Sequence, residues 1–112
     1  MFNYQPKRGD IVVANGSSYG DPNRNHYGVI VSNDTINTYS TNVIVAWMTA
    51  GENRMDLNTH EKIYSSGKVA TVHGELLQFI PKANIQKYVN TCTDIEMQRI
   101  ERCIAEAVLR NV

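Results

Sequence analysis

Four polar side chains in this sequence are of the types that transfer protons and hold phosphate charge. His26 can donate or accept a proton near neutral pH, because an unperturbed imidazole has a pKa of about 6.5. Arg24 stays protonated, and its planar guanidinium can bind two phosphate oxygens at once. Thr49 carries a hydroxyl that can donate a hydrogen bond, and Glu75 carries a carboxylate that can act as a base. These groups together could perform acid–base chemistry on a bound phosphate group.

A β-rich domain is predicted to position these side chains. The β-branched run at 11–14 is typical of a strand, and the polar stretch at 15–25 predicts a loop of about eleven residues. Arg24 lies in this loop, and His26 directly follows it. Long loops in small domains are usually functional or mobile, so we expect this loop to border the site.

Two apolar runs at 27–32 and 42–48 predict strands that are buried on both faces and form the centre of the sheet. Thr49 follows the second run and leads into Ala50-Gly51, which would place its hydroxyl at the floor of a groove. Between the runs, Asn33 or Asp34 could cap a single helical turn. Further strands are expected at 60–64, at 69–77 after a Ser65-Ser66-Gly67 turn, and at the sheet edge at 85–89.

The C-terminal segment has helical periodicity. Thr93 and Glu96 fit a capping box, and apolar residues follow at helical spacing, namely Met97, Ile100, Ile104, Ala107 and Val108. We therefore expect a single domain over residues 1–112 that is mainly β with a C-terminal helix. Strands spaced by about ten residues favour a small β-barrel.

Composition narrows the classes of partner and compartment. Eleven Lys and Arg balance eleven Asp and Glu, so any contact with nucleic acid must come from a local basic patch. The two cysteines are too few for a disulfide framework and have no zinc-like spacing. Since no apolar run is long enough to span a membrane, we expect a cytoplasmic protein without membrane contact.

Several short motifs occur in an order that resembles the MazF/PemK (Kid) toxin family. The resemblance covers residues 7–109 and rests on an opening Arg-Gly-Asp-Ile, a strand that ends in Ser-Asn-Asp, a later strand that ends in Thr49, a Thr-His pair, Glu75 and the entry to the last helix. These motifs lie at 8–11, 29–34, 42–49, 59–60, 75 and 92–97.

The resemblance implies an SH3-like barrel that forms a homodimer. It also implies cleavage of single-stranded RNA (mRNA) at short sequence motifs, without metal or cofactor, to give a 2′,3′-cyclic phosphate and a 5′-hydroxyl. The partners implied are RNA and a cognate antitoxin that neutralises the toxin, whereas DNA is not expected. In such a family member Thr49 would belong to the active site.

The sequence departs from the family where the catalytic Arg-Pro is expected, because His26 and Tyr27 occupy those positions. Our hypothesis is that His26 serves as acid or base and that Arg24 supplies the positive charge of the missing Arg. The alternative is that both are ordinary loop residues and that the site has low activity.

The other candidates also have alternatives. Thr49 could bond only its own backbone, and Glu75 could pair with a nearby Lys or Arg. Ser32 is a candidate RNA donor or a local cap. The remaining RNA-binding candidates are aromatic residues for base stacking and cations for a basic patch, namely Tyr19, Tyr27, Arg54 and Lys68.

Two histidines and the tryptophan are assigned structural roles. We expect His60 to position other groups, His73 to be a structural strand residue whose ring nitrogens have hydrogen-bond partners, and Trp47 to lie in the core or a dimer interface.

Two rival functions stay open. One is a degenerate family member that binds RNA or a peptide without cleaving it, and the other is a gyrase-poisoning toxin like CcdB, which shares the fold.

Overall fold

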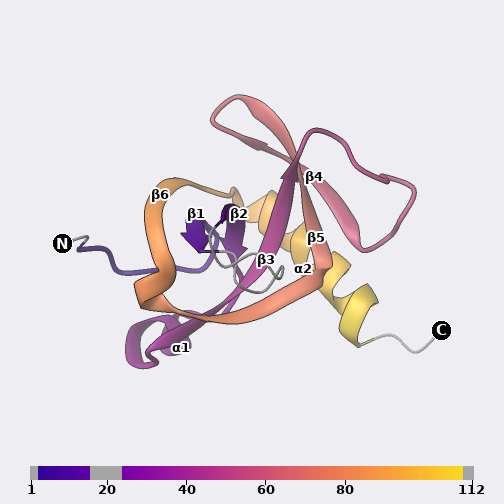
Figure 1. Ribbon diagram of the computed structural model, residues 1–112. Coiled ribbons are helices and arrows are strands. Elements are labelled where there is room, and N and C mark those ends of the chain that lie inside the picture. The colour runs from indigo at the N-terminus through magenta and orange to yellow at the C-terminus, as the bar shows by residue number, and fades with distance from the viewer. Residues whose placement is uncertain (1–2, 16–23, 110–112) are drawn as a thin grey trace.

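The computed structural model describes residues 3–15 and 24–109. Within them, six strands form one antiparallel sheet in the order β4-β5-β3-β2-β1-β6 (Figure 1). The strands are β1 (Asp10–Asn15), β2 (Asn25–Ile30), β3 (Asn42–Ala50), β4 (His60–Ser65), β5 (Lys68–Pro81) and β6 (Ile85–Thr91). The helices are α1 (Asp34–Tyr39), the short 3-10 helix η2 (Lys82–Asn84) and α2 (Asp94–Val108).

The two apolar runs form the central strand pair, as predicted, and β6 lies at an edge. Strand β5 is longer than the predicted 69–77 because Phe79 and Ile80 continue its pairing with β3, opposite Ile44 and Val43. Pro81 pairs with Asn42, and the next residue, Lys82, donates its amide to the Thr41 carbonyl at 2.9 Å. Residues along an antiparallel ladder alternate between hydrogen-bonded and non-hydrogen-bonded pairs, so the missing N–H of Pro81 leaves this pairing intact.

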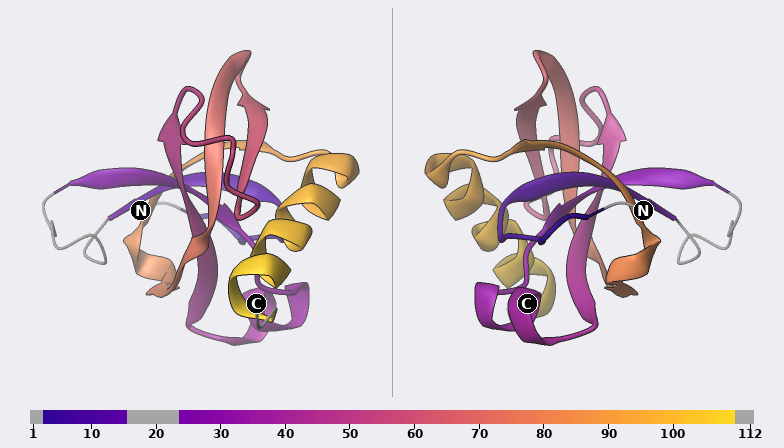
Figure 2. Two further views of the ribbon diagram at one scale, coloured as in Figure 1. Left: turned by 90° about the vertical axis from the view of Figure 1, so that its right-hand side faces the viewer. Right: turned by 90° about the vertical axis from the view of Figure 1, so that its left-hand side faces the viewer.

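The sheet buries apolar side chains on both faces, because neighbours along a strand point to opposite sides. Ile11, Val29 and Met48 join a cluster that includes Met97 and Ile100 of α2. Their neighbours Val12, Ile30 and Trp47 belong to a second cluster. The sheet curls into a half-barrel with α2 packed against β4 and β5 (Figure 2), which confirms the mainly β, SH3-like prediction with a C-terminal helix.

Side-chain caps fix both α-helices. In α2, the Thr93 hydroxyl accepts from the Glu96 amide at 3.1 Å and the Glu96 carboxylate accepts from the Thr93 amide at 2.9 Å, which confirms the capping box. Asn33 caps α1 by accepting from the Ile36 amide at 2.9 Å. Helix α1 has six residues, more than the single turn predicted, because the fully buried Asn37 anchors it through bonds to Ser32.

Gly74 of β5 lies against the backbone of α2. A Cβ atom at this position would be 2.7 Å from the carbonyl carbon and oxygen of Cys103. The helix backbone cannot yield as a flexible side chain would. We therefore expect Gly74→Ala to lower the free energy of unfolding by about 1–3 kcal/mol, as measured by urea denaturation.

Gly28→Ala is the matched control. A Cβ there would meet side-chain atoms of Trp47 and Val45, the nearest at 3.2 Å, so a smaller loss of stability is expected. Equal stability of Gly74→Ala and the unsubstituted protein would show that β5 and α2 can separate freely.

In the described part of the chain, no helix is long and apolar enough to cross a membrane.

Candidate active site

A polar cluster lies where β3, β4 and β5 meet, and its members are Thr49, Asn53, His60, His73 and Glu75. The Thr49 hydroxyl oxygen is 2.8 Å from His73 Nε2, and His73 Nδ1 is 3.1 Å from His60 Nε2. His60 Nε2 is in turn 2.9 Å from Glu75 Oε2. A continuous chain of hydrogen bonds therefore connects the end of β3 to the middle of β5.

The β4–β5 hairpin brings the two histidines together. Its turn residues Ser66 and Gly67 have φ values of 53° and 79°, and positive φ at both positions is the requirement of a type I′ turn. This turn pairs Ser65 with Lys68, and the same register pairs His60 with His73. The ring centroids are 4.2 Å apart in an edge-to-face arrangement.

The segment after β3 folds back and holds Thr49. The Asn53 side-chain amide donates to the Thr49 hydroxyl oxygen at 2.8 Å and to the Ala50 carbonyl at 3.0 Å. The Asn53 backbone amide donates to the Thr71 hydroxyl at 3.0 Å, and this hydroxyl donates to the Gly51 carbonyl at 2.6 Å. The Thr49 hydroxyl is thus fixed from two sides, by Asn53 and by His73.

The partners of His60 favour its charged form. Burial lowers the pKa of His60, but the bonds of Nδ1 to the Asn53 carbonyl and of Nε2 to Glu75 outweigh it and raise the pKa above the usual value. Burial and the nearby His60 charge lower the pKa of His73. Burial raises the pKa of Glu75, but the bond to His60 dominates and leaves this pKa below the usual range.

These preferences assign the protons of the cluster. His60 donates from both nitrogens, since carbonyl and carboxylate oxygens only accept. We assign the single proton of His60 Nε2 to a position shared between Glu75 Oε2 and His73 Nδ1. In this assignment His73 Nδ1 accepts, and His73 Nε2 carries the proton that faces Thr49. Because Asn53 also donates to Thr49, both lone pairs of this hydroxyl are engaged. Its own proton is left to donate to a ligand such as a phosphate oxygen.

Two of the four predicted catalytic residues, Thr49 and Glu75, lie in this cluster, and both histidines that connect them were assigned structural roles from the sequence. A signal for the pair was present, because counting back from a two-residue turn at Ser66-Gly67 places His60 opposite His73. The alternative for Glu75, an ion pair, is also realised, but its partner is His60 rather than a Lys or Arg.

His26 and Arg24 are not members of the cluster. His26 lies on β2 opposite Ala14, and its ring packs edge-on against Trp47 at a centroid distance of 5.9 Å. Trp47 is two residues before Thr49 on β3, so His26 and Thr49 face the same side of the sheet. Arg24 is exposed and precedes β2. Trp47 itself is buried, as expected for a core residue.

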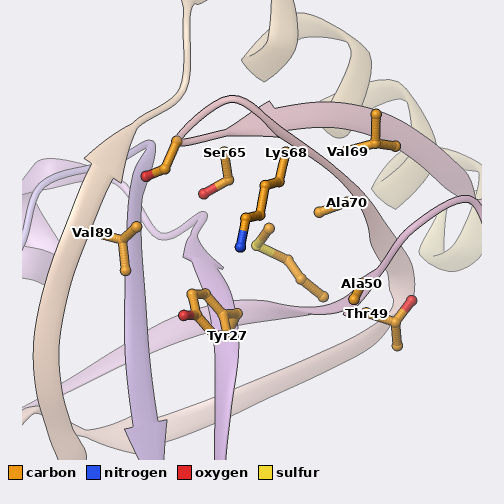
Figure 3. Close-up of a pocket in the computed structure, with 10 residues that line it drawn as sticks. Tyr27, Thr49, Ala50, Ser65, Lys68, Val69, Ala70 and Val89 are labelled. Carbon is orange, nitrogen blue, oxygen red and sulfur yellow. The ribbon is translucent and has the colours of Figure 1, made fainter.

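Tyr27 and Lys68 meet at a pocket of about 350 Å³ on the opposite face of β3. The Lys68 amine projects into this pocket above Tyr27, and the Thr49 side chain at the rim points away from its centre (Figure 3). The other lining residues are mostly small or apolar and include Met48, Ala70 and Val89. The structure therefore brings two of the predicted RNA-binding residues together, but not on the face of the polar cluster.

The remaining candidates are separate. Arg54 is exposed beside Asn53 and pairs with Asp56 at 2.9 Å. Ser32 is buried, accepts from the Ile44 amide at 3.0 Å and donates to Asn37 at 2.5 Å, which favours its local structural role. Tyr19 lies outside the residues that the structure describes.

Comparison with known proteins gives a match to one family model. The model describes the PemK-like, MazF-like toxin of type II toxin–antitoxin systems, and it matches residues 7–108. The matched residues include the whole polar cluster and every strand and helix described above.

Solved structures share the fold at low sequence identity. An endoribonuclease in complex with its cognate antitoxin, from a mycobacterial species, has a TM-score of 0.80 and 18% identity, with 96% of this chain and 98% of that chain covered. The Mycobacterium tuberculosis toxin MazF-mt6 has a TM-score of 0.75 and 16% identity over 92% and 99% of the two chains. A MazF from Deinococcus radiodurans reaches 0.79 at 9% identity over 96% and 100%.

Proposed function

The chain belongs to the PemK-like, MazF-like toxin family of type II toxin–antitoxin systems, and on this premise we propose that it is an endoribonuclease for single-stranded RNA. The observation that carries the proposal is the position of the Thr49 hydroxyl, whose oxygen lies 2.8 Å from both the Asn53 side-chain nitrogen and His73 Nε2. With the protons assigned as above, this hydroxyl keeps its own proton for an outside acceptor. A phosphate oxygen suits this donor because a fixed donor stabilises charge that develops during reaction. Two of the similar solved proteins carry the name endoribonuclease or MazF toxin.

Cleavage without a metal ion uses the 2′-hydroxyl of the RNA as the nucleophile. A base takes the 2′-hydroxyl proton, the 2′-oxygen attacks phosphorus, and the bond from phosphorus to the 5′-oxygen breaks as an acid protonates that oxygen. The products are a 2′,3′-cyclic phosphate and a 5′-hydroxyl. We propose that side chains near Thr49 carry out the individual steps of this reaction.

We assign the parts as follows. Thr49 donates to a phosphate oxygen. His26 transfers one of the two protons, as base or acid, from the same face of the sheet, and a solvent water molecule transfers the other. Arg24 holds the charge of the phosphorane. Glu75 and His60 act through His73, since their bonds fix the tautomer that donates to Thr49. None of these steps requires a cofactor.

RNA selection is assigned to the second face. The pocket of Tyr27 and Lys68 has room for a base, with an aromatic ring for stacking and an amine for a base oxygen or nitrogen. Arg54 is proposed to contact the flanking RNA, and Tyr19 stays a sequence-based prediction for base stacking. We further propose that the toxin acts as a cytoplasmic homodimer, recognises a short sequence motif and is neutralised by a cognate antitoxin.

The test uses purified protein and a long single-stranded RNA in EDTA. We expect cleavage at a recurring short motif, with 5′-hydroxyl ends that a kinase can label directly. Mapping the 5′ ends reports activity, metal independence and sequence preference together. Intact RNA over a range of pH, or growth arrest with DNA damage instead of RNA loss on induction in bacteria, would contradict the proposal.

A further inference from the structure

Three atoms of the polar cluster form a compact triangle of metal-binding type. They are His60 Nε2, His73 Nδ1 and Glu75 Oε2. The two sides to the carboxylate measure 2.9 Å from His60 and 3.4 Å from His73, and the two nitrogens are 3.1 Å apart. In a tetrahedral zinc site with bonds of about 2.0–2.1 Å, ligand atoms are about 3.3 Å apart. The triangle therefore needs only a few tenths of an ångström of movement to become one face of such a site.

The outer nitrogen of each histidine is already engaged in the way that metal-bound histidines require. His60 Nδ1 is 2.8 Å from the Asn53 carbonyl, and His73 Nε2 is 2.8 Å from the Thr49 hydroxyl. Bonds of this kind to the second nitrogen orient a ligating imidazole and fix its tautomer. Binding of a metal ion would release the proton of His60 Nε2. Both inner nitrogens could then offer a lone pair to the ion while the outer bonds of Nδ1 and Nε2 stay as they are.

Burial of the two histidine side chains distinguishes this cluster from an ordinary surface cluster. The side chains of His60 and His73 are only 5% and 10% exposed, whereas Glu75 is 39% exposed. The two rings are held by the β4–β5 register, and the partly exposed Glu75 side chain is in contact with solvent. An ion could enter there, and a water molecule or a substrate oxygen could take the fourth position.

We propose that His60, His73 and Glu75 bind a zinc ion. Two imidazole nitrogens with one carboxylate oxygen suit Zn²⁺, whereas Mg²⁺ and Ca²⁺ prefer oxygen ligands. The site does not depend on the proposed cleavage reaction, in which no metal takes part. The proposal concerns metal binding alone, so a binding measurement tests it rather than an assay of RNA cleavage.

The experiment uses untagged full-length protein that has been freed of metal with EDTA and desalted. Titration with Co²⁺, a spectroscopic substitute for Zn²⁺, is expected to produce visible d–d bands that saturate at one ion per chain. Added Zn²⁺ should displace Co²⁺ and remove the bands. Both cysteines are buried and free, and burial raises the pKa of Cys92 to about 12, so no sulfur-to-cobalt charge-transfer band is expected.

Substitutions of the proposed ligands, of a residue that supports them and of a neighbouring carboxylate test whether the ion binds at this site. His60→Gln and Glu75→Gln should each weaken Co²⁺ binding by about 100-fold or more. Thr49→Val keeps all three ligands but removes the hydroxyl that contacts His73 and Asn53, and should weaken binding by about 10–100-fold. Glu61→Gln is the matched control, because Glu61 is next to His60 but pairs with Val72 on the opposite face of β4. It should bind as tightly as the unsubstituted protein. Circular dichroism checks that each variant is folded.

The proposal is overturned if the unsubstituted protein gives no d–d bands with excess Co²⁺, or if folded His60→Gln and Glu75→Gln proteins bind as well as Glu61→Gln. Bands with a sulfur charge-transfer component would place the ion on a cysteine and also overturn it. A protein that binds zinc here but leaves RNA intact would contradict the proposed function alone.

Discussion

Replacement of Thr49 by valine is expected to lower the rate constant of RNA cleavage by about 10²–10³-fold, the typical cost of removing one preorganised donor to a reacting oxyanion. Valine has nearly the shape of threonine, so the half-buried position at the end of β3 stays filled. What it lacks is the hydroxyl that Asn53 and His73 hold from two sides. Single-turnover cleavage of a short RNA that contains the mapped motif measures the effect.

Thr49→Ser is the matched control, because serine keeps the hydroxyl and loses only a methyl group. We expect it to retain most of the cleavage rate, with the same bonds to Asn53 and His73. The loss in Thr49→Val should appear in kcat at saturating RNA, since the proposed bond strengthens as charge develops on the phosphate. If Thr49→Val cleaves as fast as Thr49→Ser, the hydroxyl has no part in the reaction.

Helices and strands whose signals lie in residues adjacent in the sequence could be predicted from the sequence alone. The capping box of Thr93 and Glu96 satisfies backbone amides within one turn, so its pattern is sufficient to locate the start of α2. The runs at 27–32 and 42–48 are mostly apolar because both faces of the central strands are buried over most of their length. In each case the physical cause lies within a few residues of the signal.

The polar cluster depends on strand register, and this is why it was only partly predicted. Thr49 and Glu75 are connected through His73 and His60, whose pairing is set by the φ values at Ser66 and Gly67. The sequence indicates a turn there, but a one-residue change of register would turn every side chain of β4 to the other face. The separation of Tyr27 and Lys68 from Thr49 has the same origin, because alternation along β2 and β3 divides the candidates between two faces.

Replacement of His26 by alanine is expected to lower kcat for RNA cleavage by about 10²–10⁴-fold, the usual contribution of a general acid or base. The residue stands where relatives are expected to carry a catalytic Arg, and its ring packs on Trp47, on the same face as Thr49. If it transfers a proton, added imidazole should restore part of the rate of His26→Ala. A packing defect would not respond to imidazole, so chemical rescue separates the two explanations.

His26→Phe provides the matched control for the contact with Trp47. Phenylalanine keeps an aromatic ring at this position but has no nitrogen, so its stability in urea should be close to that of the unsubstituted protein while its cleavage rate is as low as that of His26→Ala. Arg24→Ala in the same background tests whether the two residues act in one step, because their effects would then be less than additive. An active His26→Phe protein would exclude proton transfer by His26 and leave the Thr49 cluster as the source of catalysis.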